Sequence, residues 1–280
     1  MRKVPLALTC LAVAGLIAGC EQTGAAQTAR AVDGVAAIDQ QNLAEVMLTT
    51  ADPREAVEYF SQAASRDPEQ LLFQRGLARS LARAGRAEEA LPIWERILQH
   101  PETVLDDRVE TAEAHIRAGN WEPAQEMMNT IPPTHETYQR YRLEAMIADT
   151  RRQWDRADHF YEVAAGLTPR PAGVLNNWGF SLLTRGDHRG AERHFLDALR
   201  HEPSLFTAKN NLALARAGQR RYELPLIEMT QTERAELLHT MALAAIRQGD
   251  VAIGRSLLQE AIATHPQHFE AAVNALRALS

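Results

Sequence analysis

The chain has 280 residues, with 30 basic and 36 acidic side chains and a formal net charge of −6 at neutral pH. A surface that binds nucleic acid needs a basic excess to displace counterions from the phosphates. The acidic balance therefore argues against a nucleic-acid partner and against electrostatic attraction to an anionic membrane face. With only two cysteines, the chain also lacks the disulfide framework of a small secreted scaffold.

The N-terminus has the pattern of an export signal. Arg2 and Lys3 precede an apolar run of mostly small residues that extends to Gly19. A charged start, a short apolar run and a small-residue exit are typical of a secretory signal peptide, and the run is too short and too poor in bulky residues for a membrane-spanning helix. We therefore expect residues 1–19 to be removed.

The exit Ile17-Ala18-Gly19-Cys20 resembles the bacterial lipoprotein box. This resemblance implies that Cys20 becomes the acylated first residue. Two or more acyl chains on it would anchor the protein stably in a membrane. By the same resemblance, the Glu21 that follows favours the outer membrane, with the protein on its periplasmic face. The alternative is a plain secreted protein in which Cys20 falls there by chance.

The stretch from 20 to 41 is rich in small and polar residues and has no aromatic residue, which predicts a flexible tether. At about 20 residues, a coil of this kind spans on the order of 25 Å. Loss of Arg2 and Lys3 leaves 28 basic against 36 acidic residues, a net charge of −8. Because Cys10 leaves with the signal and Cys20 is lipidated, we expect no free thiol, no metal site and no cofactor beyond the covalent lipid.

Residues 42–280 show helical spacing of alanine and leucine and no alternating strand pattern. A small residue, a large residue four positions on, another apolar residue and then a proline recur with a period near 34, which is the signature of tetratricopeptide repeats (TPR). The recurring sets are Ala56, Phe60, Ala63, Pro68; Ala90, Trp94, Ile97, Pro101; Ala157, Tyr161, Ala164, Pro169; Ala191, Phe195, Ala198, Pro203; and Gly254, Leu258, Ala261, Pro266. The sequence thus predicts an all-α fold, a right-handed superhelix of six to seven helix pairs.

Turn and cap residues agree with this period. Glycines 85, 119, 186 and 249 mark turns between paired helices, and Asp187 and Asp250 follow two of them as expected N-caps. Two units are irregular. The third ends early at Pro132-Pro133, and the sixth has Pro225 where a small residue belongs. We expect the second helix of the sixth unit to be short, with a kink or cleft beside it.

Paired asparagines are the first candidates for partner binding. Each repeat is a pair of helices, and matching places on the predicted first helices of two adjacent repeats carry Asn176, Asn177, Asn210 and Asn211. An amide both donates and accepts, so it can pair with the backbone of an extended peptide, and Phe180, Leu183, Leu214 and Leu243 would add apolar pockets on the same side. The alternatives are amides that bond neighbouring helices and apolar residues that belong to the core.

A second candidate is the basic stripe of Arg75, Arg79 and Arg83, spaced four residues apart on one first helix. It suits a partner with carboxylates, although a solvated helix face is the more common explanation. No zinc-protease, nucleophile-elbow or phosphate-loop motif occurs, so we expect a non-catalytic protein without a small-molecule substrate.

The block NNWGFSLLTRGDHRGAERHFLDALRHEPSLFTAKNNLALARAGQRRYELPL, about residues 176–226, resembles the TadD lipoproteins of tight-adherence (Flp-type) pilus systems. General repeat resemblance covers about residues 45–279. It implies a pilotin-like outer-membrane lipoprotein that binds a secretin or another pilus-assembly subunit. Two alternatives share this architecture: a scaffold in outer-membrane barrel or cell-wall assembly, and a regulatory subunit of an envelope enzyme.

Overall fold

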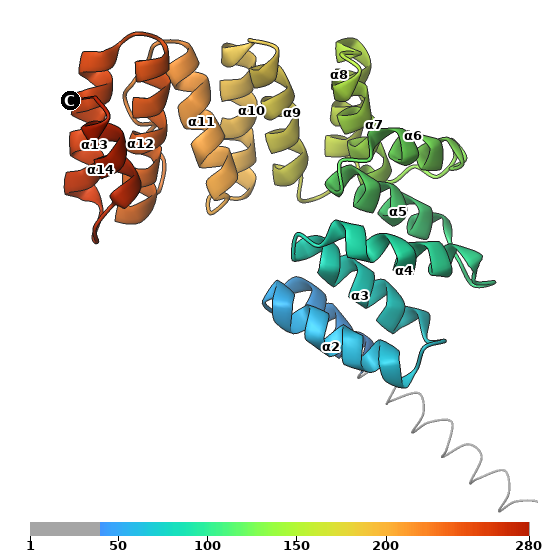
Figure 1. The fold of residues 1–280 in the computed structure, drawn as a ribbon. Coiled ribbons are helices and arrows are strands. Elements are labelled where there is room, and N and C mark those ends of the chain that lie inside the picture. The colour runs from blue at the N-terminus through green and yellow to red at the C-terminus, as the bar shows by residue number, and fades with distance from the viewer. Residues whose placement is uncertain (1–39, 280) are drawn as a thin grey trace, which may run out of the picture. The chain divides into compact units, whose positions relative to one another are not determined.

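The computed structural model describes residues 40–279 (Figure 1). The signal peptide, Cys20 and most of the predicted tether lie outside the described residues. Residues 40–49 are helical, so this first described helix includes two residues that the sequence assigns to the tether. Every regular element within 40–279 is a helix, which confirms the all-α class.

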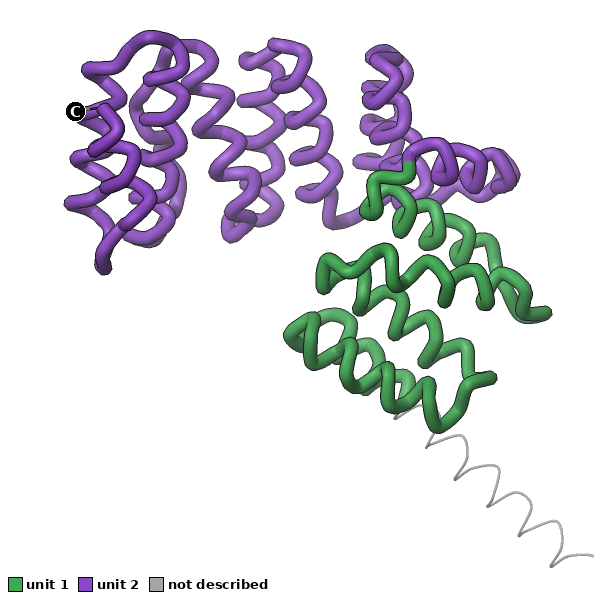
Figure 2. The backbone as a smooth tube through the Cα atoms, viewed as in Figure 1, with its two compact units in different colours: residues 1–120 green, residues 121–280 purple. Residues whose placement is uncertain are grey.

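Thirteen further helices follow in chain order. They are α2 (Pro53–Arg66), α3 (Leu71–Arg83), α4 (Ala87–Gln99), α5 (Leu105–Arg117), α6 (Trp121–Asn129), α7 (Tyr138–Thr150), α8 (Trp154–Gly166), α9 (Ala172–Thr184), α10 (His188–His201), α11 (Phe206–Gly218), α12 (Gln231–Arg247), α13 (Val251–Thr264) and α14 (Glu270–Arg277). The chain divides after Asn120 into two compact units, which we call unit 1 and unit 2 (Figure 2). The third and the sixth unit, in contrast, are repeats counted along the chain, each of them expected to be one helix pair.

Each unit is built from packed helix pairs. In unit 1, the helix at 40–49 packs on α2, and α3 packs on α4. In unit 2, α7 pairs with α8, α9 with α10 and α12 with α13, and the short α14 packs on α13. The predicted architecture of consecutive helix pairs is therefore confirmed.

The large residue of each second helix fills the space between helices, as the period predicts. Phe60, Trp94, Tyr161, Phe195 and Leu258 are all at most 1% exposed. In the third unit, a methionine takes this place, because Met128 follows Ala124 by four residues and both are buried. Repeat spacing thus identifies the core positions directly.

The turns between paired helices need a left-handed backbone. Glycines 85, 119, 186 and 249 have φ between 76° and 87°, a conformation that glycine adopts without a Cβ penalty. Two arginines, Arg152 and Arg220, take the corresponding turns after α7 and α11 with φ of 56°. Their side chains make these two turns strained relative to the glycine turns.

Replacing Arg152 with glycine is expected to raise the free energy of unfolding by about 0.5–1 kcal/mol, because relief of the left-handed strain outweighs the entropy of a freer unfolded chain. Urea unfolding measures this change. Gln153→Gly is the control: Gln153 is also exposed but has φ of −86°, so its replacement should lower stability. Equal effects at both positions would contradict the strain at Arg152.

The caps agree with the sequence only in part. Asp187 accepts a hydrogen bond from the Gly190 N–H at 2.8 Å, as expected. Asp250 does not cap α13 with its side chain. Its carboxylate instead bonds Arg220 at 2.9 Å and the Tyr222 hydroxyl at 2.5 Å, which ties the loop after α11 to the turn before α13.

The sixth repeat departs from the prediction. Its second helix is not short but absent: residues 219–230 form a non-helical segment between α11 and α12. Pro225 lacks an N–H for a helical bond and restricts the residue before it, and Thr230 caps α12 through a reciprocal pair of bonds with Glu233.

Apolar side chains of this segment pack against the core where the missing helix would have packed. Tyr222, Leu224 and Met229 pack against the buried cluster of α12 and α13, whereas Ile227 packs against that of α10 and α11. The buried ammonium of Lys209 on α11 contacts Glu233 at 2.9 Å, which fixes the start of α12.

The third unit ends early, as predicted. Its second helix, α6, has nine residues, and the loop that contains Pro132-Pro133 follows it. The guanidinium of Arg140 donates to the carbonyl oxygens of Pro132, Pro133 and His135 at 3.0–3.2 Å. A buried cation therefore holds this loop against α7.

Candidate partner-binding face

The first helices of unit 2 lie in sequence against one another: α7 contacts α9, α9 contacts α11, and α11 contacts α12. Met146, Phe180 and Leu214 occupy equivalent positions 34 residues apart, and Leu243 follows after a shorter interval because the sixth unit is truncated. We call these four side chains the first-helix face. Phe180 is 51% exposed and the other three are half-buried.

The core contact of α9 explains why Phe180 is available. Gly179, the preceding residue, lies against the Phe195 ring of α10, where an added Cβ would come within 2.6 Å of a ring carbon. The helix therefore buries its Gly179 side and leaves Phe180 toward solvent. The sequence predicted Phe180, Leu183, Leu214 and Leu243 for this side and missed Met146, which the 34-residue period identifies. Leu183 instead packs against the buried cluster of α10 and α11.

The asparagines link successive first helices. Asn211 Nδ2 donates to Asn176 Oδ1 at 3.1 Å, and both residues are buried. Asn210 Oδ1 accepts from Thr240 Oγ1 at 2.7 Å, and Asn177 Nδ2 lies 3.7 Å from Met146 Sδ. The structure thus shows the helix-bonding alternative for the Asn176 and Asn211 pair.

Partner binding stays a prediction for all four asparagines. Asn177 and Asn210 are the better candidates, because they are half-buried. Asn177 also contacts a member of the first-helix face.

The arginine stripe is occupied within unit 1. Arg75 forms two bonds of 2.7 Å with Asp107 on α5, and Arg79 Nε donates to Glu110 at 3.0 Å. Arg83 donates to the carbonyl oxygens of Met47 and Ala51 at 3.2 Å, which lie at the C-terminal end of the helix at 40–49 and just after it. All three arginines therefore join neighbouring helices, and a contact with a partner stays a prediction.

A polar network joins α7, α8 and α9. Asp149 accepts from Ser181 Oγ at 2.6 Å and from Tyr161 Oη at 2.8 Å. Burial raises the pKa of the Asp149 carboxyl, and the two hydrogen bonds oppose that rise. Ser181 is buried, and its hydroxyl donates a hydrogen bond to Asp149, so this network links α7 to α9.

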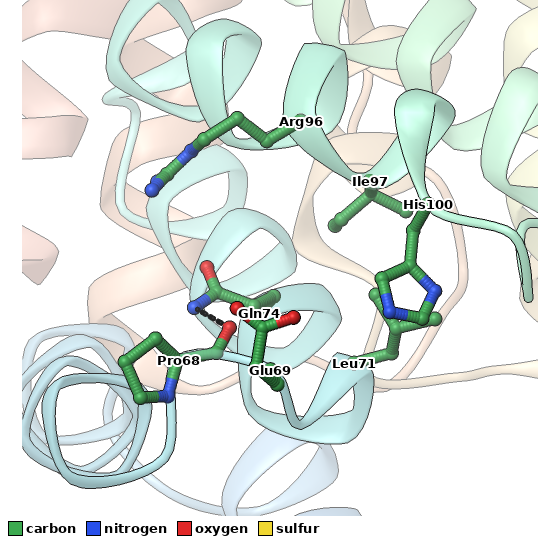
Figure 3. Close-up of a pocket in the computed structure, with 7 residues that line it drawn as sticks. All are labelled: Pro68, Glu69, Leu71, Gln74, Arg96, Ile97 and His100. Atoms are coloured by element: carbon green, nitrogen blue, oxygen red, sulfur yellow. Dashed lines mark hydrogen bonds between the residues drawn. The ribbon is translucent and has the colours of Figure 1, made fainter.

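Unit 1 contains a small hollow between the segment before α3 and the end of α4 (Figure 3). Leu71 and Ile97 supply apolar lining, and Gln74 Nε2 donates to the Pro68 carbonyl at 3.1 Å. Its volume of about 200 Å³ is below the range of 300–1,000 Å³ typical of small-molecule sites. Figure 3 shows Arg96 and His100 on opposite sides, so they do not converge on one ligand.

Two further properties of residues 40–279 concern metal ions and membranes. No cluster of three or more histidine, cysteine, aspartate or glutamate side chains is arranged to hold a metal ion among these residues. Over the same range, no helix combines the length and the apolar character needed to cross a membrane. Cys20, the predicted lipidation site, lies outside this part of the chain.

Comparison with known families decides the identity of the repeats. The tetratricopeptide repeat family model matches residues 42–101, 177–224 and 239–279, together more than half of the chain. The chain belongs to the tetratricopeptide repeat family. Proteins of such repeats are generally non-catalytic scaffolds for protein–protein interaction, because their stacked helix pairs expose extended binding surfaces.

Solved tetratricopeptide repeat structures share the fold at low identity. The chain is similar to the Cut9–Hcn1 APC/C hetero-tetramer (TM-score 0.61, 15% identity, 84% of this chain and 48% of that chain) and to the human IFIT1 dimer with m7Gppp-AAAA (0.62, 14%, 84% and 61%). It is also similar to a tetratricopeptide repeat protein from Parabacteroides merdae (0.52, 14%, 85% and 96%). The chain spans about half to three fifths of the first matching structures. No curated protein matches it.

Proposed function

We propose that this protein is a non-catalytic, lipid-anchored factor of the outer membrane whose first-helix face binds a segment of a secretin or another pilus-assembly subunit. The observation that carries the proposal is the row of apolar side chains on adjacent first helices, with Phe180 half exposed. An exposed aromatic flanked by half-buried apolar residues is typical of a binding anchor.

The chemistry of the face suits an extended, mostly uncharged segment. Met146, Phe180 and Leu214 offer apolar contacts in sequence along the unit, and the amides of Asn177 and Asn210 lie among them with donor and acceptor capacity. Lipidation at Cys20 would hold the repeats at the membrane where a secretin assembles. The resemblance to TadD lipoproteins supplies the pilus system.

The first test measures secretin multimers in outer-membrane fractions from cells with the wild-type gene, its deletion or Cys20→Ala. We expect the deletion to lose multimers and Cys20→Ala to mislocalise the secretin. Unchanged multimers in all three strains would overturn the secretin role and favour assembly of barrel proteins or of the cell wall.

The second test addresses the face itself. Phe180→Ala is expected to weaken binding of the purified secretin at least tenfold, because truncation of a central aromatic anchor costs about 2 kcal/mol or more. Leu167→Ala is the matched control, since Leu167 is 44% exposed but lies at the end of α8 and outside the face. Equal affinities of the two variants would show that the secretin binds elsewhere.

A further inference from the structure

The non-helical segment that replaces the second helix of the sixth repeat borders a hollow on α10. Leu196, Leu199 and Pro203, from α10 and the segment after it, line one part, and Ile227 of the 219–230 segment lines another. The hollow has a volume of about 340 Å³. It is distinct from the first-helix face because its helical residues come from a second helix.

A fully exposed leucine stands beside this hollow. Leu226 has no side-chain burial, although its neighbours Pro225 and Ile227 are buried and half-buried. Isolated exposed leucines are common on protein surfaces, but Leu226 also lines the hollow itself. One small patch therefore carries both an apolar projection and an apolar recess.

The same patch carries one charge of each sign. Arg200 and Glu228 both line the hollow, and both are exposed. Arg200 also contacts Asp197 within α10, in an exposed pair that contributes little to stability. A charge of each sign within one patch allows a two-fold pairing in which the arginine of one copy faces the glutamate of another.

We propose that this patch is a homodimer contact in which Leu226 of each copy enters the hollow of the other. A two-fold contact uses the same surface on both subunits, and a patch with both a projection and a recess, and both a positive and a negative group, can be complementary to itself. Because projection and recess belong to one patch, the contact closes at two copies and does not extend into a fibre.

The size of the patch sets the expected strength. A contact confined to this hollow and its rim lies at the small end of specific interfaces, so we expect dissociation constants on the order of 10–100 µM in solution. Confinement of both copies to one membrane surface would raise their effective concentration. The dimer does not depend on the secretin role, so either proposal can fail alone.

The experiment co-expresses two differently tagged copies of the full chain, cross-links them in intact cells while both are held at the membrane, and measures how much of one copurifies with the other after detergent extraction. Wild-type copies are expected to copurify, and Leu226→Ser in both copies should reduce the recovered partner at least tenfold. Leu167→Ser is the control, because it removes an exposed leucine outside the patch. Leu226 and Arg200 are both exposed. The thermal unfolding temperature should therefore be unchanged in Leu226→Ser and in the Arg200→Glu variant described next.

Reversing the charges of Arg200 and Glu228, singly and in combination, gives the decisive test of the two-fold contact. Two copies with Arg200→Glu, or two copies with Glu228→Arg, place like charges together and should copurify poorly. One copy of each variant restores both opposite-charge pairs and should copurify as the wild type does. Absence of wild-type copurification, or copurification that neither Leu226→Ser nor the charge variants alter, would overturn the proposal.

Discussion

Replacing Arg75 with alanine is expected to lower the free energy of unfolding by about 3 kcal/mol, because it leaves the Asp107 carboxylate buried without its cation. The Asp107 side chain is only 2% exposed, and Arg75 bonds both of its oxygens at 2.7 Å. The bond from the Val104 N–H at 2.9 Å remains but carries no charge. Urea unfolding gives the total loss, and amide hydrogen exchange should locate it in α3 and α5.

Arg83→Ala is the matched control on the same helix. Among residues 40–279, Arg83 donates only to the carbonyl oxygens of Met47 and Ala51, and its loss strands no buried charge there. We expect a cost of about 1 kcal/mol or less. If the two variants lose equal stability, the buried pair does not hold unit 1, and Arg75 again becomes a candidate for partner contact.

The Arg75 variant should also change the dependence of stability on pH. Burial opposes ionisation of Asp107, but the bonds from Arg75, the Val104 N–H and Thr103 outweigh it and hold the pKa of the carboxyl below its ordinary value of 3.8. A lowered pKa in the folded state stabilises the protein above pH 4 and loses that contribution as pH falls through the folded value. Arg75→Ala should therefore flatten the fall in stability below about pH 4.

The second helices were predictable because their pattern is local and forced by packing. A large residue such as Phe195 needs a small residue one turn before it and another after it, and a single sequence shows that spacing. The turn glycines follow for the same reason, since only a few residues tolerate positive φ. Arg152 and Arg220 escaped prediction because side-chain chemistry does not mark a strained turn.

Polar residues on the first helices were harder to interpret, because their partners lie one repeat away. Asn176 bonds Asn211, and Arg75 bonds Asp107, 32 residues further along the chain. A helix periodicity shows that such a residue is off the core face but not whether it meets solvent or the next helix. Complementary charges near one repeat length would have put Asp107 among the candidate partners of Arg75.

The sixth unit shows the limit of counting a period. The sequence indicated a defect at Pro225, but a shortened helix and a complete loss of helix differ by only a few bonds in the backbone. Tyr222, Leu224 and Met229 supply apolar contacts to the α12–α13 cluster from a non-helical segment. Tertiary packing therefore stabilises an irregular backbone that repeat statistics alone would not select.

Gly179→Ala is expected to lower the free energy of unfolding by about 2–3 kcal/mol, because its methyl group has no room. A Cβ at Gly179 would lie 2.6, 2.8 and 3.0 Å from three carbon atoms of the Phe195 ring, which is fully buried. Gly173→Ala on the same helix is the control: nothing lies within 4 Å of its added Cβ. That variant should gain up to about 1 kcal/mol from the higher helix propensity of alanine.

A double-mutant cycle tests whether the Phe195 ring causes the loss. Phe195→Leu removes ring atoms that Gly179→Ala would contact, so the double variant should be more stable than the sum of the single losses predicts by at least about 1 kcal/mol. Additive losses would place the strain elsewhere in α9. Because Phe180 follows Gly179, a shift of α9 away from α10 also moves the exposed ring of the first-helix face. Gly179→Ala should then weaken partner binding with Phe180 intact, and Phe195→Leu should partly restore it.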